Sequence, residues 1–310
     1  MINRRNFVTG SSLLTVTAAS PNALSAQEPA VFKYQDATAK RELTKLEKRI
    51  GGRLGVALTN AQGGIALAHR GDERFAMCST FKAPLAFALF DAADKGQVDM
   101  KKSFAVTEGD LVPYAPFVEQ QLAAKKMVTL EQLAKATVKS SDNAAANLIL
   151  KAIGGPEAFT DFVRRRGDTV TRLDRIEPFL NENKVGDPRD TTSPIAFAQL
   201  MHGLMSGKSR APNWAIVYDA MATSKTGLAR IRLGLPYGWP VGNKTGTAGD
   251  GLAYNDVAIF WPSFAGYEGD QPRSLTVYTD RPTASAAVVE RTIAEVAKIA
   301  AWVAPRRNGP

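Results

Sequence analysis

The sequence predicts a mixed α/β (α+β) fold, in which an antiparallel sheet is flanked by terminal helices and an all-helical lobe is inserted into the chain. Strand-like patterns lie near both ends of the 310 residues, whereas residues 80–221 carry mostly helical patterns. Because strands from the two ends can share a sheet only if the ends meet in space, the helical middle becomes a second lobe. We expect the active site in the crevice between the two lobes.

The first elements of the chain are a helix and a hairpin. Residues 53–59 and 65–69 form two predicted strands, joined by a turn that contains two glycines. Gly51 and Gly52 end the helix that precedes them. Its apolar residues recur at helical spacing: Ala39, Leu43, Leu46 and Ile50.

The middle of the chain alternates helices with one long irregular segment. Helices are predicted at 80–94, 130–139, 144–153 and 156–166. Residues 171–190 break this rhythm with two prolines, and long irregular segments inside compact domains are usually functional. The chain ends with two predicted strands and a long amphipathic helix, at 255–261, 274–279 and about 289–303.

The first 26 residues resemble a bacterial export signal. Arg4 and Arg5 precede Phe7 and a mildly apolar run, and small residues at 23–26 offer a cleavage site. The arginine pair favours the twin-arginine route, and the run is too short to anchor the protein in a membrane. We therefore expect an exported, periplasmic or secreted protein. Its α/β lobe would comprise 27–75 plus 223–310, and its helical lobe 76–222.

The composition limits the possible partners. The formal charge is +9, but the Lys and Arg residues are scattered and form no nucleic-acid-binding motif. A positive field modestly favours small anionic substrates. The single cysteine excludes an internal disulfide, and the two histidines, His69 and His202, have no metal-like partner spacing. We expect no metal, no cofactor, no nucleic acid, no stable membrane anchor and a monomer.

The first candidate motif is Ser79-Thr80-Phe81-Lys82, at the start of a predicted helix. A serine hydroxyl needs a base to become a nucleophile, and Lys82 lies one turn away on the same helix face. The free N–H groups of the helix start favour a developing oxyanion. Alone, the motif is also explained by a capping serine beside a surface lysine.

Two further motifs have the same ambiguity. Ser141-Asp142-Asn143 precedes a helix, where capping explains such residues well, but Ser141 could also shuttle a proton and Asn143 could bind a carbonyl. Lys244-Thr245-Gly246 and the following Thr247 fit an edge strand that binds a carboxylate, with a glycine that permits close approach. A second Lys-Thr-Gly, at 225–227, leads into a short helix and is rejected.

Taken together in this order, Ser-x-x-Lys, Ser-Asp-Asn and Lys-Thr-Gly resemble the signature of the penicillin-recognising serine enzymes, in the form known for class A β-lactamases. The resemblance covers about residues 54–303. It implies hydrolysis of penicillins and cephalosporins through an acyl-enzyme on Ser79. It also implies an oxyanion site at the N–H groups of Ser79 and Thr247.

A fourth motif separates the members of that superfamily. Residues 177–181 read Glu-Pro-Phe-Leu-Asn and resemble the class A omega loop, a name we use for residues 171–190. The resemblance implies that Glu177 activates the deacylating water, which Asn181 helps to hold. It leaves open whether Glu177 or Lys82 is the base in acylation. It argues against a penicillin-binding DD-peptidase, and no transmembrane tether of a β-lactam sensor is predicted.

Other positions match the family less strongly. Tyr114 resembles the tyrosine beside the site, and Arg175 with Asp190 resembles the ion pair that closes the omega loop. Arg232 matches the arginine that helps to bind the substrate carboxylate, with Arg230 as the alternative.

One departure bears on the substrate spectrum. Some carbapenem-hydrolysing members pair a cysteine before the nucleophile with a second one just after Lys-Thr-Gly-Thr, but here Cys78 is present and the second position is Ala248. This weakens a carbapenemase interpretation, whereas Thr247 resembles members with good cephalosporin activity.

Overall fold

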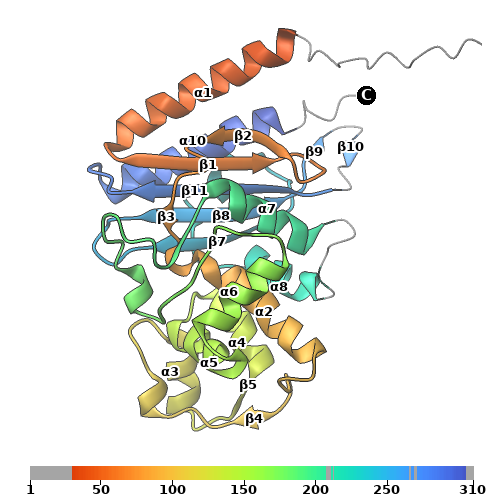
Figure 1. Cartoon of the computed structure of the whole chain (residues 1–310), viewed down its shortest axis with the longest axis vertical. Coiled ribbons are helices and arrows are strands. Elements are labelled where there is room, and N and C mark those ends of the chain that lie inside the picture. The colour runs from red at the N-terminus through yellow and green to blue at the C-terminus, as the bar shows by residue number, and fades with distance from the viewer. Residues whose placement is uncertain (1–29, 207–210, 212, 265–266, 269–270, 305–310) are drawn as a thin grey trace, which may run out of the picture.

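The computed structural model describes residues 30–206, 211, 213–264, 267–268 and 271–304. Its largest sheet has five antiparallel strands in the order β2-β1-β11-β8-β7, drawn across the upper half of Figure 1. Arg53 of β1 pairs with Asp280 of β11, so the two ends of the chain do meet in one sheet. The strands are β1 (Arg53–Thr59), β2 (Ile65–His69), β7 (Val241–Thr247), β8 (Tyr254–Phe260) and β11 (Arg273–Asp280).

Ten α-helices and three short strand pairs complete the described part of the chain. The strand pairs are β3 (Phe75–Ala76) with β6 (Thr191–Thr192), β4 (Ser103–Phe104) with β5 (Val128–Thr129), and β9 (Ser263–Phe264) with β10 (Tyr267–Glu268). The helices are α1 (Ala30–Ile50), α2 (Lys82–Asp94), α3 (Pro116–Ala123), α4 (Leu130–Lys139), α5 (Asn143–Ile153), α6 (Pro156–Arg165), α7 (Pro194–Met205), α8 (Trp214–Ala222), α9 (Ile231–Gly234) and α10 (Ala286–Val303).

Helices cover both faces of the sheet, so its strands are buried on both sides. Successive residues of a strand point to opposite faces. In β8, Ala258 and Phe260 join the apolar cluster formed with α1 and α10, whereas Val257 and Ile259 join the cluster formed with α2, α7 and α8. The alternating set on β1 that faces α1 and α10 is Leu54, Val56 and Leu58.

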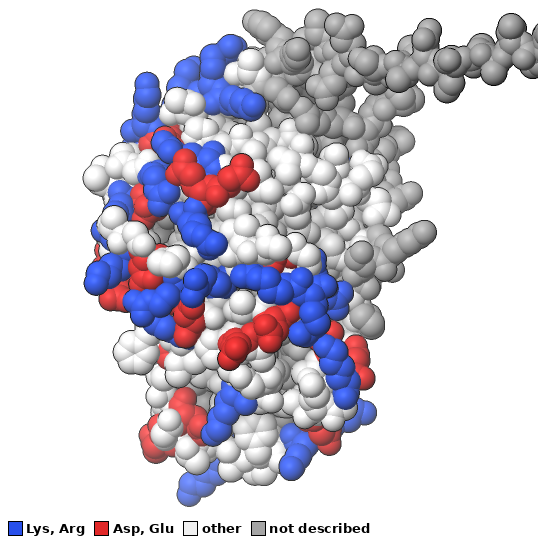
Figure 2. Space-filling model, viewed as in Figure 1, with Lys and Arg blue, Asp and Glu red and all other residues white. Residues whose placement is uncertain are grey.

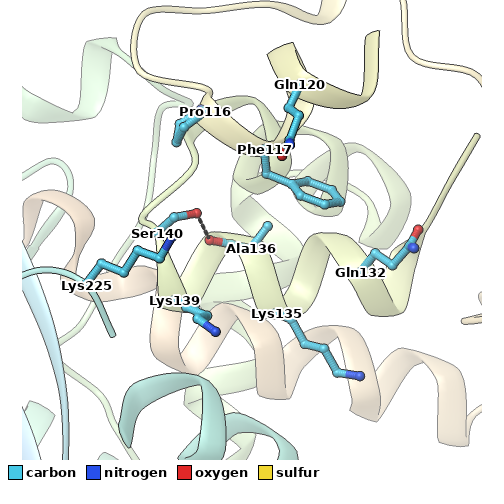
Figure 3. A pocket seen from close by; sticks show the side chains of 9 residues that line it. All are labelled: Pro116, Phe117, Gln120, Gln132, Lys135, Ala136, Lys139, Ser140 and Lys225. Carbon is cyan, nitrogen blue, oxygen red and sulfur yellow. Dashed lines mark hydrogen bonds between the residues drawn. The ribbon is translucent and has the colours of Figure 1, made fainter. Parts of the chain in front are cut away.

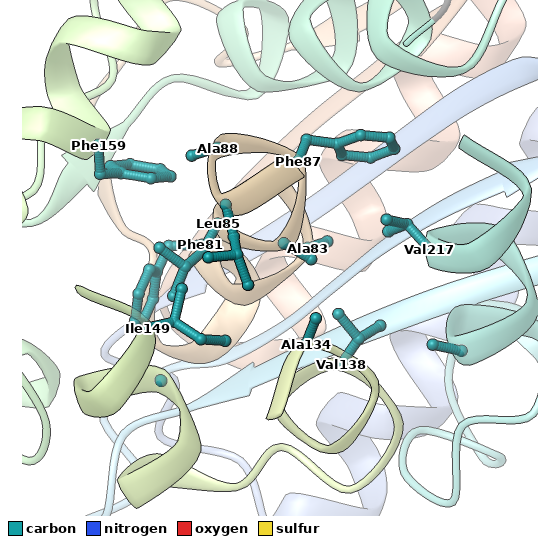
Figure 4. Close-up of a cluster of buried hydrophobic side chains, with 14 of the residues drawn as sticks. Phe81, Ala83, Leu85, Phe87, Ala88, Ala134, Val138, Ile149, Phe159 and Val217 are labelled. Atoms are coloured by element: carbon teal, nitrogen blue, oxygen red, sulfur yellow. The ribbon is translucent and has the colours of Figure 1, made fainter. Parts of the chain in front are cut away.

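Helix α2 is the centre of the larger cluster. Every residue from Lys82 to Phe90 is buried, and Figure 4 shows apolar side chains of neighbouring helices packed around it, among them Val138, Ile149 and Phe159. A helix that is apolar on nearly all sides must be buried on all sides. The packing of α2 in the core therefore also fixes the position of the 3-10 helix at Cys78–Phe81, which leads into it.

The predicted elements are present, with small shifts at their ends. β1, β2 and α4 span the predicted residues, whereas the helix expected from residue 80 begins as an α-helix at Lys82, after a 3-10 helix at Cys78–Phe81. Helix α7 lies within the predicted helical lobe, yet it packs on the sheet, where Phe197 contacts Tyr278 edge to face at 6.1 Å between ring centroids. One apolar cluster thus joins the helices to the sheet, and the division into lobes at residues 75 and 222 stays a prediction.

Charged side chains of both signs share the face seen in Figure 2. A band of Lys and Arg crosses its middle, and Asp and Glu side chains lie beside the band. Ion pairs such as Arg53–Asp280 (2.7 Å) and Arg189–Asp187 (2.6 Å) neutralise part of the positive charge. Among the described helices, none is both long and apolar enough to cross a membrane. The predicted export signal, residues 1–26, lies outside the described residues.

Candidate active site

Ser79 lies in the 3-10 helix that leads into α2. The residue before it, Cys78, has a left-handed backbone (φ 46°), which turns the chain sharply at this point. Asn255 on β8 donates from Nδ2 to the carbonyl oxygens of Ala76 (2.9 Å) and Met77 (3.3 Å), and thereby fixes this turn to the sheet. Ser79 itself is half-buried, so a small molecule can reach its hydroxyl.

A chain of polar contacts joins Ser79 to Glu177 and Lys82. The Ser79 hydroxyl donates to Glu177 Oε1 at 3.2 Å, and Lys82 Nζ lies 2.9 Å from the same oxygen. The side chains of Lys82 and Glu177 are fully buried. Glu177 can therefore accept the serine proton directly, and Lys82 can exchange it through the same carboxylate oxygen.

Lys82 is held on several sides. Its Nζ also donates to the carbonyl oxygen of Ser141 (2.9 Å) and to Asn143 Oδ1. Burial lowers the pKa of Lys82, and the charge of Glu177 opposes this change. The neutral amine is therefore easier to form here than on a surface lysine.

Ser141 stands between the two lysines. Its hydroxyl accepts a hydrogen bond from Lys244 Nζ at 2.9 Å, while its carbonyl oxygen faces Lys82. Burial lowers the pKa of Lys244 well below its usual value, and the positive charge of Lys82 acts in the same direction. We call Ser79, Lys82, Ser141 and Lys244 the acylation cluster.

The middle residue of Ser-Asp-Asn is structural. Asp142 caps α5 by accepting from the N–H of Ala145 (2.7 Å), and its other oxygen accepts from the N–H groups of Phe117 (2.8 Å) and Val118 (3.1 Å) on α3. The capping explanation is thus correct for Asp142. Its bonds to α3 and α5 also hold Ser141 and Asn143 against Lys82.

Strand β7 carries the Lys-Thr-Gly motif along the edge of the sheet. Alternate N–H groups of an edge strand have no strand partner and can bind a ligand. A Cβ atom at Gly246 would lie 2.5 Å from the carbonyl oxygen of Met77. This glycine is required for the packing of β7 against the chain before Ser79, and its role in admitting the substrate stays a prediction. Thr245 on the same strand shares a hydrogen bond of 2.8 Å with Thr226.

The two candidate arginines lie in different places. Arg230 is buried and donates from Nη2 to Thr247 Oγ1 at 3.0 Å, beside the site. Arg232 donates to the carbonyl oxygens of Met221 (3.0 Å) and Ala222 (2.9 Å), and to Asn243 Oδ1 on β7 (2.7 Å). The structure thus places Arg230, the alternative, beside Thr247, and uses the guanidinium of Arg232 to join α8 to β7. Which of the two arginines binds the substrate carboxylate stays a prediction.

The omega loop is closed by the predicted ion pair. Arg175 Nε lies 2.6 Å from Asp190 Oδ2, and Asp190 Oδ1 accepts from the N–H groups of Asp174 (2.8 Å) and Arg175 (2.9 Å). Arg175 also contacts Glu182. Asp190 is buried, so these bonds form largely out of water.

Glu177 is fixed from two directions. Asn147 on α5 accepts from the Glu177 N–H and donates to the Glu177 carbonyl oxygen, both at 2.9 Å. Asn181 Nδ2 donates to Glu177 Oε2 at 2.5 Å, and Asn181 Oδ1 is buried with no partner among the described residues. An amide oxygen of this kind can accept a hydrogen bond from a water that is shared with Glu177.

Asn147 and Asn255 were not predicted from the sequence. Asn147 follows Asn143 by four residues and thus shares its helix face, which is a signal that could have revealed it. Asn255 lies in an apolar strand, where a buried amide requires partners, but nothing in the sequence indicates that they are the carbonyls before Ser79.

Tyr114 lies beside the acylation cluster. Its backbone is left-handed (φ 66°) and its carbonyl oxygen accepts from the Asn143 N–H at 3.0 Å. Its side chain is 57% exposed, as expected for an aromatic residue that contacts a ligand at the entrance. Asn143 Nδ2 donates to the Pro113 carbonyl oxygen at 2.7 Å, which holds this segment to α5.

Cys78 is a packing residue. It is buried in a small cluster with Ala76, Ala248 and Ala253, and burial raises the pKa of its thiol. A high pKa keeps the thiol protonated and unreactive.

A hollow between α3 and α4 is not the site. It has a volume of about 320 Å³, Figure 3 shows Phe117, Lys135 and Lys139 around it, and none of the predicted site residues lines it. Within the described residues, no group of three His, Cys, Asp or Glu side chains could hold a metal ion. The site is therefore identified by its side-chain chemistry rather than by its volume.

Comparisons with known proteins show the family of the chain. A model of the β-lactamase enzyme family matches residues 38–303. β-Lactamase CTX-M-97 of Escherichia coli is 39% identical over 291 residues, which cover 94% of this chain and 96% of that protein. β-Lactamase L2 of Stenotrophomonas maltophilia is 37% identical over 305 residues, with 97% and 98% covered. The structure of an ancestral class A β-lactamase is similar, with a TM-score of 0.78, 44% identity, and 84% of this chain and 98% of that chain covered.

Proposed function

The chain belongs to the β-lactamase enzyme family as a class A serine β-lactamase that hydrolyses β-lactams and so gives resistance to them, and we propose that Ser79 is its nucleophile. The observation that carries this assignment is the half-buried Ser79 hydroxyl, which donates to the buried Glu177 carboxylate beside Lys82. Penicillins and cephalosporins are the expected substrates.

Acylation begins when the Ser79 hydroxyl loses its proton and attacks the lactam carbonyl carbon. Glu177 is the direct hydrogen-bond partner of the hydroxyl, and Lys82 shares the same carboxylate oxygen, so either group can act as the base. The N–H groups of Ser79 and Thr247 would stabilise the oxyanion. Ser141 would then pass a proton from the lysines to the ring nitrogen as the C–N bond breaks.

Substrate binding would use the edge strand and its neighbours. Lys244, Thr245 and Arg230 offer donors to the ring carboxylate, because all three lie at or beside β7. Asn143 and Tyr114 would bind the side-chain end of the substrate. Gly246 would contribute only its backbone, since its close packing leaves no room for a side chain.

Deacylation would depend on the omega loop. Glu177 would remove a proton from a water held with Asn181, and the resulting hydroxide would attack the ester carbon and release Ser79. This step separates the proposed function from that of a DD-peptidase or a sensor, which remain acylated.

The test is turnover by purified protein with benzylpenicillin and a chromogenic cephalosporin, with intact mass recorded in parallel. We expect many turnovers by the wild type, and a lasting adduct on Ser79 in Glu177→Ala, because acylation survives better than deacylation. A stoichiometric burst by the wild type, followed by a persistent adduct, would contradict the proposal. So would turnover by Glu177→Ala at the wild-type rate.

The cellular context follows from the export signal predicted at residues 1–26. We propose that the enzyme is exported to the periplasm and acts as a monomer. Fractionation of cells that produce the full chain, with and without Arg4→Lys and Arg5→Lys, tests the twin-arginine route.

A further inference from the structure

The part of the omega loop that follows Asn181 lacks apolar anchoring. No residue from 181 to 189 is buried, and Val185 is 75% exposed. A cavity of about 470 Å³, lined partly by Arg74 and Val185, lies beneath this segment. Polar contacts rather than core packing must therefore hold it in place.

Asn183 supplies the contacts that tie this segment to the sheet. Its Nδ2 donates to the carbonyl oxygen of Leu252 (3.0 Å) and to Asp280 Oδ1 (3.1 Å), and its own carbonyl oxygen accepts from Arg281 Nη2 (2.7 Å). Among the described residues, the hydrogen bonds from 182–188 to the sheet and its turns all involve Asn183. Its left-handed backbone (φ 43°) is one that asparagine adopts more readily than most residues.

The partner of this contact lies on the turn that follows Thr247. Leu252 belongs to the β7–β8 turn, which is closed by the bond from Ala248 N–H to the Ala253 carbonyl oxygen (3.0 Å). The Leu252 carbonyl oxygen also accepts from the Arg281 N–H at 2.8 Å. Asn183 therefore joins the loop that carries Asn181 to the turn that follows the proposed oxyanion residue.

We propose that Asn183 is a positioning residue of this enzyme, whose side chain ties the omega loop to the β7–β8 turn and thereby keeps Asn181 in register with Glu177. The proposal rests on the proposed function. Asn181 lies two residues before Asn183 and donates to Glu177 Oε2, so a shift of this segment would move the amide that holds the deacylating water.

Two variants separate the hydrogen bonds from the backbone. Asn183→Gly keeps the left-handed conformation and removes the side chain. Asn183→Asp keeps the shape but replaces the donor with a carboxylate that repels Asp280. The matched control is Lys184→Gly, which frees the backbone of the same segment but removes a side chain that is exposed and outside the link.

The kinetic measurement compares the acylation and deacylation rates of the wild type and the variants with benzylpenicillin. In both Asn183 variants we expect deacylation to slow several-fold while the acylation rate stays constant. A deacylation rate within twofold of the wild type, or a slowing in Asn183→Gly and Lys184→Gly but not in Asn183→Asp, would overturn the proposal.

Hydrogen exchange gives a readout that does not need activity. In Asn183→Asp, we expect faster exchange in 182–188 and in 248–252 together, and no change in Lys184→Gly at 248–252. Unchanged exchange at 248–252 would overturn the link even if kinetics changed. A wild type that did not turn over benzylpenicillin would refute the proposed function, and the exchange data would still decide the link.

Discussion

In the proposed mechanism the acylation cluster and the omega loop supply the two halves of one reaction, but different forces hold them. Ser79 and Lys82 lie at the start of α2, whose residues are buried as far as Phe90, and Lys244 lies on a strand of the main sheet. The omega loop buries few side chains and depends on the Asp190 ion pair, the Asn147 contacts and Asn183.

This difference has a consequence for how each half responds to change. A nucleophile fixed by core packing cannot shift without disturbing many contacts, because interiors are close-packed. A loop held by a few polar ties can be loosened one tie at a time, with little effect on the global free energy of unfolding. We therefore expect single substitutions in the omega loop to slow deacylation while they leave the acylation rate nearly unchanged.

The largest separation is expected from Asp190→Asn. This substitution removes the charge that pairs with Arg175 in a buried position, and breaking a buried pair costs about 3–5 kcal/mol. Because the pair joins two parts of the same loop, we expect its loss to disorder the omega loop rather than to unfold the protein. Deacylation should then slow at least about a hundredfold. Rapid-mixing measurements of both steps, together with Tm, check this expectation.

The matched control for this change is Asp187→Asn. Asp187 lies in the same loop, but its carboxylate bonds to Arg189 two residues away rather than across the loop. It should leave deacylation near the wild-type rate. An equal effect of both substitutions, or an Asp190→Asn variant that loses acylation as severely as deacylation, would remove the distinction between the two regions.

The scaffold itself should respond to pH through His202. Burial, with help from the charge of Arg273, lowers the pKa of His202 from 6.5 to about 4, and its Nδ1 contacts Thr59 Oγ1 at 3.2 Å. A histidine with a lower pKa in the folded state binds its proton less tightly there. Its contribution to stability is therefore complete above about pH 6.5 and is lost as the pH falls towards 4.

For the wild type this loss amounts to about 2 kcal/mol of unfolding free energy at pH 5. His202→Asn keeps a polar atom near the position of Nδ1 but does not titrate in this range. Denaturant unfolding at pH 7.5 and pH 5 should show a smaller decrease in the variant. Parallel decreases in both proteins would mean that His202 does not cause the acid sensitivity of the scaffold.

The scaffold was the part that sequence reasoning predicted best. Periodicity reports which face of a strand or helix is buried, so β1, β2 and α4 were predicted with their observed ends. The three short motifs and Glu177 were located by their residue types and order. Their assembly at Ser79 is a tertiary contact that periodicity cannot report.

What could not be predicted are contacts between polar groups far apart in the sequence. Asn183 meets Leu252 and Asp280 across 69 and 97 positions, and a surface asparagine in a turn gives no sign of such partners. The choice between Arg230 and Arg232 is hard for a related reason. The two arginines lie two residues apart at the start of α9 and both bond to β7, and the sequence does not indicate that Arg230 meets Thr247 whereas Arg232 meets Asn243.

The smallest of the expected effects comes from substituting these two arginines. Arg230→Ala removes a donor beside Thr247, so we expect kcat/KM for benzylpenicillin to fall about tenfold, mainly through KM, since the carboxylate is bound before and during the reaction. Arg232→Ala serves as the matched control, because its guanidinium bonds to the carbonyls of Met221 and Ala222. It should lower Tm while KM changes little. A KM that rose in Arg232→Ala but not in Arg230→Ala would support the sequence prediction and would place the carboxylate on the α8 side of β7.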